Sequence, residues 1–261
     1  MIREAASVIL LRHAEPGFEV FLLRRRKGAS FMASAFVFPG GGAEPHEDAK
    51  ETAARELFEE AGVLLAHDVS QADTLETPLV AVLRKRILDG MDARVVLGTV
   101  GLAWSVDLLV PWAHWITPSI EPKRFSAQFF VAELPEGQEP SFDAIETVDQ
   151  VWVRPADALT RIAELALPPP QIRTCWELAQ CATIEEVFAT ARAREPHAIL
   201  PRLAPAGPSL LLPWDPEYAT LGTGEAMPMP ALPSWAHGPS RFVMEERAWK
   251  HVAAPGSTTA G

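Results

Sequence analysis

The sequence lacks the features that mark disulfide-rich, nucleic-acid-binding and membrane-spanning proteins. Its 261 residues include two cysteines, Cys175 and Cys181, without the paired His/Cys spacing of a zinc site, so we expect reduced core thiols. The net charge is −11 and no long run of Lys and Arg is present, which argues against a nucleic-acid polymer as a partner. The apolar run near the N-terminus ends at Arg12 after about seven residues, too short for a signal peptide or a membrane span. We therefore expect a cytoplasmic protein with no membrane partner.

What the sequence does contain is ordinary globular material. Hydrophobic residues make up 48% of the chain, charged residues 22% and aromatic residues 8%, which is enough for a full core. The length allows one large domain or one domain with an extension. A small anionic ligand is compatible with the negative charge if metal ions screen an acidic site.

Strand and helix patterns alternate over the first part of the chain. Residues 5–12 and 18–25 are β-rich runs joined by the turn signal HAEPG, and together they predict a hairpin. Further strands are expected at 112–117, 124–134 and 148–153, and helices at 75–90 and 154–165. This mixture predicts an α/β sandwich with a mixed β-sheet.

The character of the sequence changes after the segment LPPP at 167–170. Helical patterns fill 171–194, where Thr183 and Glu186 have capping-box spacing, and Pro and Gly become frequent further on. We expect three regions: a main domain at 1–166, a helical extension packed on it at 167–220, and a Pro/Gly-rich tail at 221–261 with a disordered end. The extension could cover a pocket or form the contact of a homodimer, and the sequence leaves both open.

The segment FPGGGAEPHEDAKETAARELFEEAGV, residues 38–63, crowds carboxylates onto one expected helix. Asp48 is a good N-cap, Glu51 completes a capping box, and Gly62 suits a left-handed C-cap, so a helix is predicted over 48–61. On a helical wheel the apolar residues of this helix share one half, which should face the core. They are Ala49, Ala53, Ala54, Leu57, Phe58 and Ala61.

Three glutamates, Glu56, Glu59 and Glu60, fall on the rim beside that apolar half, and Arg55 can pair with Glu59 or Glu51. One arginine cannot neutralise them all, and adjacent carboxylates raise one another's pKa unless positive charge lies between them. Mg²⁺ and Mn²⁺ answer that need because they prefer oxygen ligands, and the preceding glycines can bring a backbone carbonyl close to the same ion. The alternative is a solvated acidic helix face with no ligand.

The spacing of the whole segment resembles the signature of the Nudix hydrolases. Gly41 is followed after five residues by Glu47, and after seven more by the run Arg55-Glu56-Leu57-Phe58-Glu59-Glu60-Ala61-Gly62-Val63. All nine specified positions of the pattern G-x5-E-x7-R-E-U-x-E-E-x-G-U are matched, with U apolar. This resemblance implies an α/β/α sandwich fold and hydrolysis of nucleoside diphosphates linked to another group, with Mg²⁺ or Mn²⁺ as cofactor.

The same resemblance assigns roles to individual residues. It implies that Glu56, Glu59, Glu60 and Arg55 form the catalytic group, with the three glutamates binding metal and the carbonyl of Gly41 contacting a metal. It also implies that Glu47 and Arg55 orient the loop and the helix through salt bridges. The general base is left open, because Glu59, Glu60 or a loop acid could serve. The loop acids are Glu133, Glu136, Glu139 and Glu146.

Three flanking segments resemble the branch that contains the peroxisomal coenzyme A diphosphatases of animals and their bacterial relatives. They are SFMASAFVFPGG, LVPWAHWITPSIEPKRFSAQFFVAELP and LLLPWDPEY. This resemblance implies coenzyme A or acyl-coenzyme A as the substrate. The alternatives are a housecleaning hydrolase of ADP-ribose, NADH or other nucleotides, and a Nudix-fold ligand sensor without catalysis.

Basic residues near the expected site are candidates for substrate contacts. Arg24 and Arg25 lie between the first hairpin and the glycines, where they could meet phosphates. Lys123 and Arg124 could contact a 3′-phosphate if coenzyme A is the substrate. The aromatic residues of the 112–130 region are expected in the core rather than as a platform for stacking an adenine base.

Overall fold

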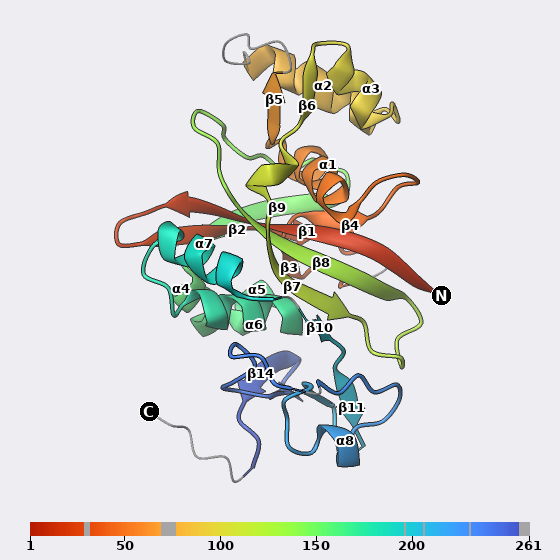
Figure 1. The fold of residues 1–261 in the computed structure, drawn as a ribbon, viewed down its shortest axis with the longest axis vertical. Coiled ribbons are helices and arrows are strands. Elements are labelled where there is room, and N and C mark those ends of the chain that lie inside the picture. Colours follow the sequence, from red (N-terminus) through yellow and green to blue (C-terminus); the bar gives the residue numbers. More distant parts are fainter. Residues whose placement is uncertain (29–31, 69–76, 196, 206, 230, 256–261) are drawn as a thin grey trace.

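The computed structural model describes residues 1–28, 32–68, 77–195, 197–205, 207–229 and 231–255. These residues build an eight-stranded mixed sheet at the centre of the molecule (Figure 1). Its strands are β1 (Ile2–His13), β2 (Phe18–Arg25), β3 (Phe36–Val37), β4 (Gly40–Gly42), β7 (Val110–Ile116), β8 (Arg124–Glu133), β9 (Thr147–Val153) and β10 (Ala198–Ile199). The strand order is β10-β7-β8-β1-β2-β3, with β4 also paired to β1 and β9 to β2. Because β1 runs parallel to β8 and antiparallel to β2, the predicted hairpin and mixed sheet are confirmed.

The central strand β1 is buried on both faces. Ile9 and Leu11 belong to the hydrophobic core on one face of the sheet, whereas Val8 and Leu10 belong to the core on the other. Side chains alternate between the two faces of a strand, so a strand covered on both sides needs an unbroken apolar run. The run Val-Ile-Leu-Leu meets that need and places β1 in the middle of the sandwich.

Helices cover both faces of the sheet, as Figure 1 shows, which confirms the predicted α/β/α order. α1 (Ala49–Ala61) packs on one face, and α4 (Pro155–Thr160), α6 (Pro169–Leu178) and α7 (Ile184–Ala193) pack on the other. The expected helix over 154–165 is divided, because Arg161 has a φ of −112° and a ψ of 21° that end α4. The short α5 (Ile162–Leu165) follows it.

A small lobe stands beyond α1 on the same side of the sheet (Figure 1). It contains α2 (Thr77–Leu88), α3 (Ala93–Gly98), the paired strands β5 (Ala66–Asp68) and β6 (Leu102–Trp104), and the short 3-10 helix η1 (Val106–Leu108). Leu83 of α2 and Val96 of α3 are buried in the hydrophobic core that α1 shares. The sequence predicted α2, and the other elements of this lobe had no expectation.

The chain beyond α7 is β-rich, which corrects the helical extension expected over 167–220. Only α6, α7 and the short α8 (Tyr218–Leu221) are α-helical there among the described residues. β10 joins the main sheet in parallel with β7. β11 (Arg202–Ala204), β12 (Ser209–Leu211), β13 (Arg241–Glu245) and β14 (Ala248–Val252) form a separate antiparallel sheet in that order.

The tail expected at 221–261 therefore contains two paired strands, which is a second correction. β13 and β14 pair from Arg241↔Val252 to Glu245↔Ala248, and Glu246 and Arg247 form the turn with φ values of 48° and 68°. Two positive φ values in a two-residue loop match the twist of an antiparallel pair. The Pro/Gly content correctly indicated irregular backbone between α8 and β13, but it concealed the strand pattern that follows. The end of the predicted tail, 256–261, lies outside the described residues.

Two further expectations concern single features of the fold. Cys175 is buried and Cys181 is partly buried, and neither forms a disulfide. No helix in the described part of the chain is both long enough and apolar enough to span a membrane.

Candidate active site

Helix α1 begins and ends as its sequence predicts. Asp48 accepts hydrogen bonds from the N–H groups of Lys50 and Glu51, and the Glu51 side chain accepts from the Asp48 N–H at 3.0 Å, completing the capping box. Gly62 ends the helix with a φ of 69°. Such a conformation costs little for glycine and is strained for other residues.

Arg84 of α2 adds an unpredicted clamp on the same helix end. Its guanidinium donates to the carbonyl of Glu59 at 2.9 Å and to that of Glu60 at 3.0 Å. It also donates to the carbonyl of Ser141 at 2.9 Å. A cation at the C-terminus of a helix is favourable because the free carbonyls there are partly negative. Arg84 therefore ties the carboxylate-bearing end of α1 to the loop before β9.

The glycines of β4 bring backbone against the acidic face of α1. A Cβ on Gly41 would lie 2.5 Å from Oε1 of Glu56, a distance that no real side chain tolerates. The N–H of Gly40 donates to Oε2 of Glu60 at 2.9 Å. Only a residue without a side chain lets the loop approach this closely, so Gly41 is needed for contact rather than for an unusual φ.

Arg55 is the hub of the site, and all five of its N–H donors are used. Nε and Nη2 donate to the two oxygens of Glu47 at 2.7 and 3.0 Å, and Nη2 also donates to the Gly42 carbonyl at 2.8 Å. Nη1 donates to Glu56 Oε1 at 2.9 Å and to Glu59 Oε2 at 3.1 Å. The side chain is 4% exposed. The planar fork of an arginine suits such shared carboxylate binding, and the predicted positioning role of Arg55 and Glu47 agrees with these contacts.

Burial and crowding change the acidity of the carboxylates. Burial, together with the neighbouring charge of Glu59, raises the pKa of Glu56 to about 7, although Arg55 opposes the shift. Burial and the charge of Glu56 raise the pKa of Glu60 to about 8. Burial alone would also raise the pKa of Glu47, but hydrogen bonds from Arg55 and from the Glu44 N–H hold it below its ordinary value. The site therefore has less positive charge than its carboxylates require.

A cavity of about 1060 Å³ opens beside these residues. We call the part formed by Gly40–Gly42, Glu56, Glu59 and Glu60 the box wall. We call the part formed by 167–171, Leu203, Leu210 and 247–249 the C-terminal wall. One continuous space thus joins the predicted catalytic carboxylates to the region beyond residue 166, which shows what that region covers.

The loop between β8 and β9 brings two acids to the cavity, Asp143 and Glu146. Of the four predicted loop carboxylates, all of them described, Glu146 alone lines it, whereas Glu133 pairs with His13 at 3.2 Å. The loop is held by Oδ1 of Asp143, which accepts from the N–H groups of Ile145, Glu146 and Thr147 at 2.8 to 3.0 Å. The loop thus fixes the backbone of Glu146, and its side chain lines the cavity.

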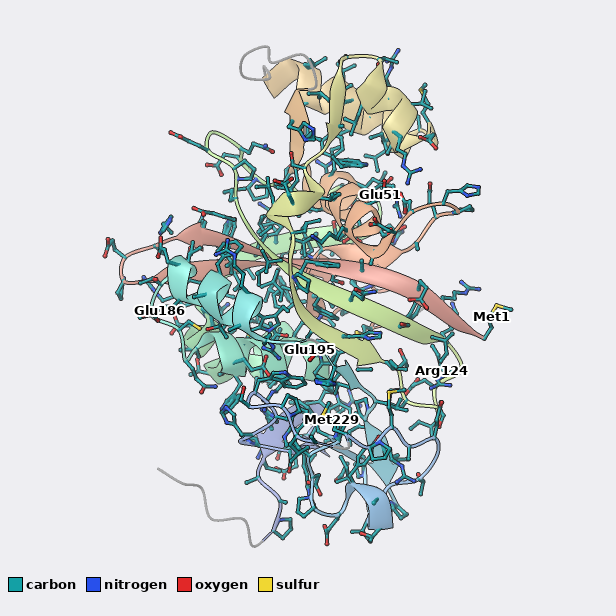
Figure 2. The ribbon with its side chains drawn as sticks, in the orientation of Figure 1. Met1, Glu51, Arg124, Glu186, Glu195 and Met229 are labelled. Carbon is teal, nitrogen blue, oxygen red and sulfur yellow. The ribbon has the colours of Figure 1, made fainter. Side chains whose placement is uncertain are left out.

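The predicted substrate-contacting residues are placed differently from one another. Arg25 lines the cavity, and its buried Nε has no hydrogen-bond partner among the described residues. Arg24 lies 3.9 Å from Asp149, and Lys123 is exposed, and neither lines the cavity. Arg124 donates to Glu225 at 2.8 Å and lies well apart from α1, which Glu51 marks in Figure 2. The structure brings only Arg25 of these four to the site.

Arg247 is the basic residue at the cavity that the sequence did not reveal. It lies in the β13–β14 turn, more than 180 residues from the glutamates of the box wall. No local pattern could have linked the two, because the Pro/Gly-rich surroundings of Arg247 indicated only a tail.

The donor set suits a hard divalent cation. Glu56 and Glu59 share Arg55 with Glu47, burial raises the pKa of Glu56, Glu59 and Glu60, and glycine backbone lies against Glu56. Among the residues that the structure describes, no three Asp, Glu, His or Cys side chains already converge on a common point as a finished metal site. The predicted metal ligands Gly41, Glu56, Glu59 and Glu60 all line the cavity and stay a prediction.

Comparison with protein-family models decides the classification. The model described as the NUDT19 Nudix domain matches residues 45–178, just over half of the chain, and the NUDIX domain model matches residues 1–86. The chain belongs to the Nudix hydrolase family. This confirms the resemblance that the 41–63 spacing indicated.

Several Nudix relatives are similar along much of the chain. The putative nudix hydrolase 7 of Caenorhabditis elegans is 30% identical over 187 residues, 68% of this chain and 61% of that protein. The acyl-coenzyme A diphosphatase NUDT19 of Homo sapiens is 32% identical over 161 residues, 55% of this chain and 42% of that protein. The Xenopus laevis protein of the same name is 24% identical over 235 residues and covered to 62%. The chain thus spans less than two thirds of the length of each of these relatives.

A solved Nudix structure supports the fold. The crystal structure of a NUDIX hydrolase from Alicyclobacillus acidocaldarius superimposes with a TM-score of 0.63 at 29% identity. The match covers 72% of this chain and 96% of that one. The α/β/α sandwich is therefore the Nudix fold.

Proposed function

We propose that this protein hydrolyses the pyrophosphate bond of coenzyme A or acyl-coenzyme A with Mg²⁺ or Mn²⁺ as cofactor. One observation carries the proposal: a single cavity of about 1060 Å³ joins the carboxylates of the box wall to the largely apolar C-terminal wall. A nucleotide with a long organic arm needs both parts, whereas a bare nucleotide does not need the second. The names of the human and Xenopus relatives, acyl-coenzyme A diphosphatase, support the same substrate.

Glu56, Glu59 and Glu60, with the backbone of Gly41, are the residues that would hold the cation. A divalent cation held there supplies positive charge to the phosphate oxygens and makes a water molecule more acidic. Arg55 keeps Glu56, Glu59 and the glycine loop in one arrangement through its contacts with Glu47, Glu56, Glu59 and Gly42, and the N–H of Gly40 holds Glu60. Preorganised charge of this kind stabilises a transition state without rearrangement during the reaction.

The protein itself has little covalent chemistry to perform. A water molecule attacks one phosphorus in line, the bridging P–O bond breaks, and the second phosphate leaves. Glu146 lines the cavity close enough to Glu56 and Glu60 to affect their pKa values, so we assign it as the base that takes the proton from that water. Arg25 lines the cavity, and we assign it to binding a phosphate oxygen because its Nε–H has no partner among the described residues.

A substrate panel tests the proposal. The purified protein is incubated with Mg²⁺ or Mn²⁺ and coenzyme A, acyl-coenzyme A, ADP-ribose, NADH or a nucleoside triphosphate. Release of 3′,5′-ADP and a phosphopantetheine from coenzyme A is the expected result. Turnover of ADP-ribose or NADH alone would instead indicate a housecleaning hydrolase of nucleotides. Ligand binding without cleavage would indicate a ligand sensor.

Two variants test the residue roles within that panel. Glu59→Gln should remove most turnover, because it deletes a charge from the cation-holding group, and Glu146→Gln should lower kcat more than it raises KM. Glu133→Gln is the matched control and should keep its activity, because Glu133 ends β8 and pairs with His13 instead of lining the cavity. Full activity of Glu59→Gln with Mg²⁺ present would reject the assignment.

The remaining expectations extend this proposal. We expect a small-molecule substrate, a cytoplasmic location, and no membrane or nucleic-acid partner. The C-terminal region contributes to the cavity wall, which supports the covering role, and a homodimer stays a prediction.

A further inference from the structure

Besides Nε of Arg25, which the proposed function assigns to the diphosphate, two buried polar groups of cavity-lining residues form no hydrogen bond within the described part of the chain. One is the side-chain oxygen of Gln171, which is 5% exposed, and the other is the indole Nε1–H of Trp115, which is 4% exposed. Both residues line the cavity. A buried donor or acceptor without a partner is costly, so two of them on residues that line one cavity are expected to meet a ligand there.

The two groups are complementary in kind. Gln171 offers an acceptor and Trp115 offers a donor, and a secondary amide presents one N–H and one C=O. Trp115 belongs to the same hydrophobic core as Ile172, the residue after Gln171 in α6, so both groups lie on the same face of the sheet. An amide is therefore the ligand group that satisfies both sides of this pair.

The surroundings disfavour an anion or a sugar at this place. Pro169 and Pro170 occupy the first positions of α6, so the helix start lacks the N–H groups that would bind a phosphate. The neighbouring cavity wall is apolar, with Leu167, Leu210 and Trp249. A chain in which amides are separated by methylene groups fits such a wall, whereas a ribose would leave several hydroxyl groups unpaired.

We infer that Gln171 and Trp115 bind the amide groups of the substrate's organic arm and so determine specificity for a pantetheine-type chain over a sugar. The inference rests on the proposed function for its place in a substrate, and it concerns residues that hold the arm rather than the diphosphate. The box wall and the amide-binding pair then recognise two different parts of one molecule.

The first test uses the unaltered protein and pantetheine, which has the amide groups but no phosphate. The Nε1–H resonance of Trp115 in a ¹⁵N-resolved spectrum should shift as pantetheine is added, and Trp115→Phe identifies that resonance. Trp112 provides an internal control, because its indole nitrogen is also buried and unpartnered among the described residues but does not line the cavity. An unmoved Trp115 resonance at saturating pantetheine would overturn the inference.

The second test uses matched variants. Gln171→Met keeps the length of the side chain without its amide, and Trp115→Phe removes the indole N–H. Each should weaken pantetheine binding and raise KM for coenzyme A about tenfold, corresponding to about 1.4 kcal/mol, with KM for ADP-ribose unchanged. Trp112→Phe should leave KM for coenzyme A and KM for ADP-ribose unchanged.

Changing the ligand separates a specific contact from a loss of packing. A pantetheine analogue with ester oxygen in place of the amide N–H should bind the wild-type protein less tightly than pantetheine and bind Gln171→Met equally well. Equal effects of the variants on coenzyme A and ADP-ribose would overturn the inference while leaving the hydrolase in place. No cleavage of any substrate would defeat the proposed function, and the pantetheine titration would still decide the amide site.

Discussion

Two buried arginines, one near each wall of the cavity, solve the same physical problem in different ways. Arg55 satisfies its donors with three carboxylates and one carbonyl, all within 13 residues of it in sequence. Arg173 of α6 has one carboxylate, Glu177, and otherwise donates to the carbonyls of Trp235, His237 and Pro239. The first arginine organises a local motif, and the second fastens together parts of the chain that are more than 60 residues apart.

The electrostatic consequences differ accordingly. Burial lowers the pKa of Arg173, and the charge of Arg194, which donates to the same Glu177 at 2.9 Å, adds to the lowering while Glu177 opposes it. The pKa of Arg55 is raised despite burial, because Glu47, Glu56 and Glu59 surround it. Of the two walls, the box wall is the one with excess negative charge among the described residues, and this marks it as the place for a cation.

The largest effect is expected when Arg55 is removed. Arg55→Met would leave Glu47, Glu56 and Glu59 without their shared partner, so the free energy of unfolding should fall by about 3–5 kcal/mol and activity should be lost. Urea denaturation measures the change. Arg161→Met, which removes an exposed pair with Glu164, is the control and should leave stability nearly unchanged. Equal stabilities of the two variants would contradict the hub role of Arg55.

A smaller change at the box wall should act on activity rather than on folding. A methyl group at Gly41 would overlap the carboxylate of Glu56, which Arg55 holds in place, so Gly41→Ala should lower kcat/KM about 100-fold. Gly98→Ala meets no atom within 4 Å and should be silent. A Gly41→Ala enzyme with normal kinetics would show that the close approach has no catalytic purpose.

At the C-terminal wall a substitution should affect the stability of the protein and its binding of the substrate's organic arm. Arg173→Met should lower the free energy of unfolding by about 1–3 kcal/mol, because three carbonyls lose a donor while Glu177 keeps Arg194. KM for coenzyme A should rise because α6 carries Gln171, whereas kcat should change little. Arg192→Met, an exposed arginine of α7, is the comparison variant. An unchanged KM together with a lower kcat would contradict the assignment of the C-terminal wall to the organic arm of the substrate.

The pH dependence of stability should come from the carboxylates of the box wall. The folded pKa values of Glu56 and Glu60, about 7 and about 8, exceed the ordinary value of 4.5, so their contribution is present below about pH 4.5 and is lost as pH rises through 7 and 8. The metal-free protein should therefore lose stability between pH 5 and 8, by about 1.4 kcal/mol for each unit of pKa shift.

Mg²⁺ should restore that stability, and Glu60→Gln should reduce the pH-dependent loss in the metal-free protein. Chemical denaturation in EDTA and in Mg²⁺ at each pH provides the measurement. A free energy of unfolding in EDTA that does not change with pH would mean that folding does not raise the pKa of these two carboxylates.

Much of the box wall could be predicted because its causes are local. Asp48, Glu51 and Gly62 set the limits of α1 by capping, and the wheel correctly separated its apolar side from Glu56, Glu59 and Glu60. Arg55 was expected to pair with Glu59 or Glu51, and the pairing with Glu59 is present. Glu51 instead pairs with Arg94, because α3 folds back against the start of α1.

The C-terminal wall could not be predicted in the same way. Its strands β11 and β12 have three residues each and pair with each other, and β12 pairs with β13 some 30 residues later. Such short runs carry almost no periodic signal. Lys123 and Arg124 were chosen for their charge, yet Arg124 is engaged by Glu225, a contact between residues about 100 apart. The partnerless oxygen of Gln171 becomes visible only once α6 lies against the cavity.

The sequence by itself determined the carboxylate helix, its caps, the glycine loop and the family, because each depends on interactions within about 20 residues along the chain. Tertiary structure decided which acid of the β8–β9 loop, which arginines and which amide meet in the cavity. These groups come from segments whose meeting depends on packing over the whole sheet, and packing of distant segments leaves no fixed spacing in sequence.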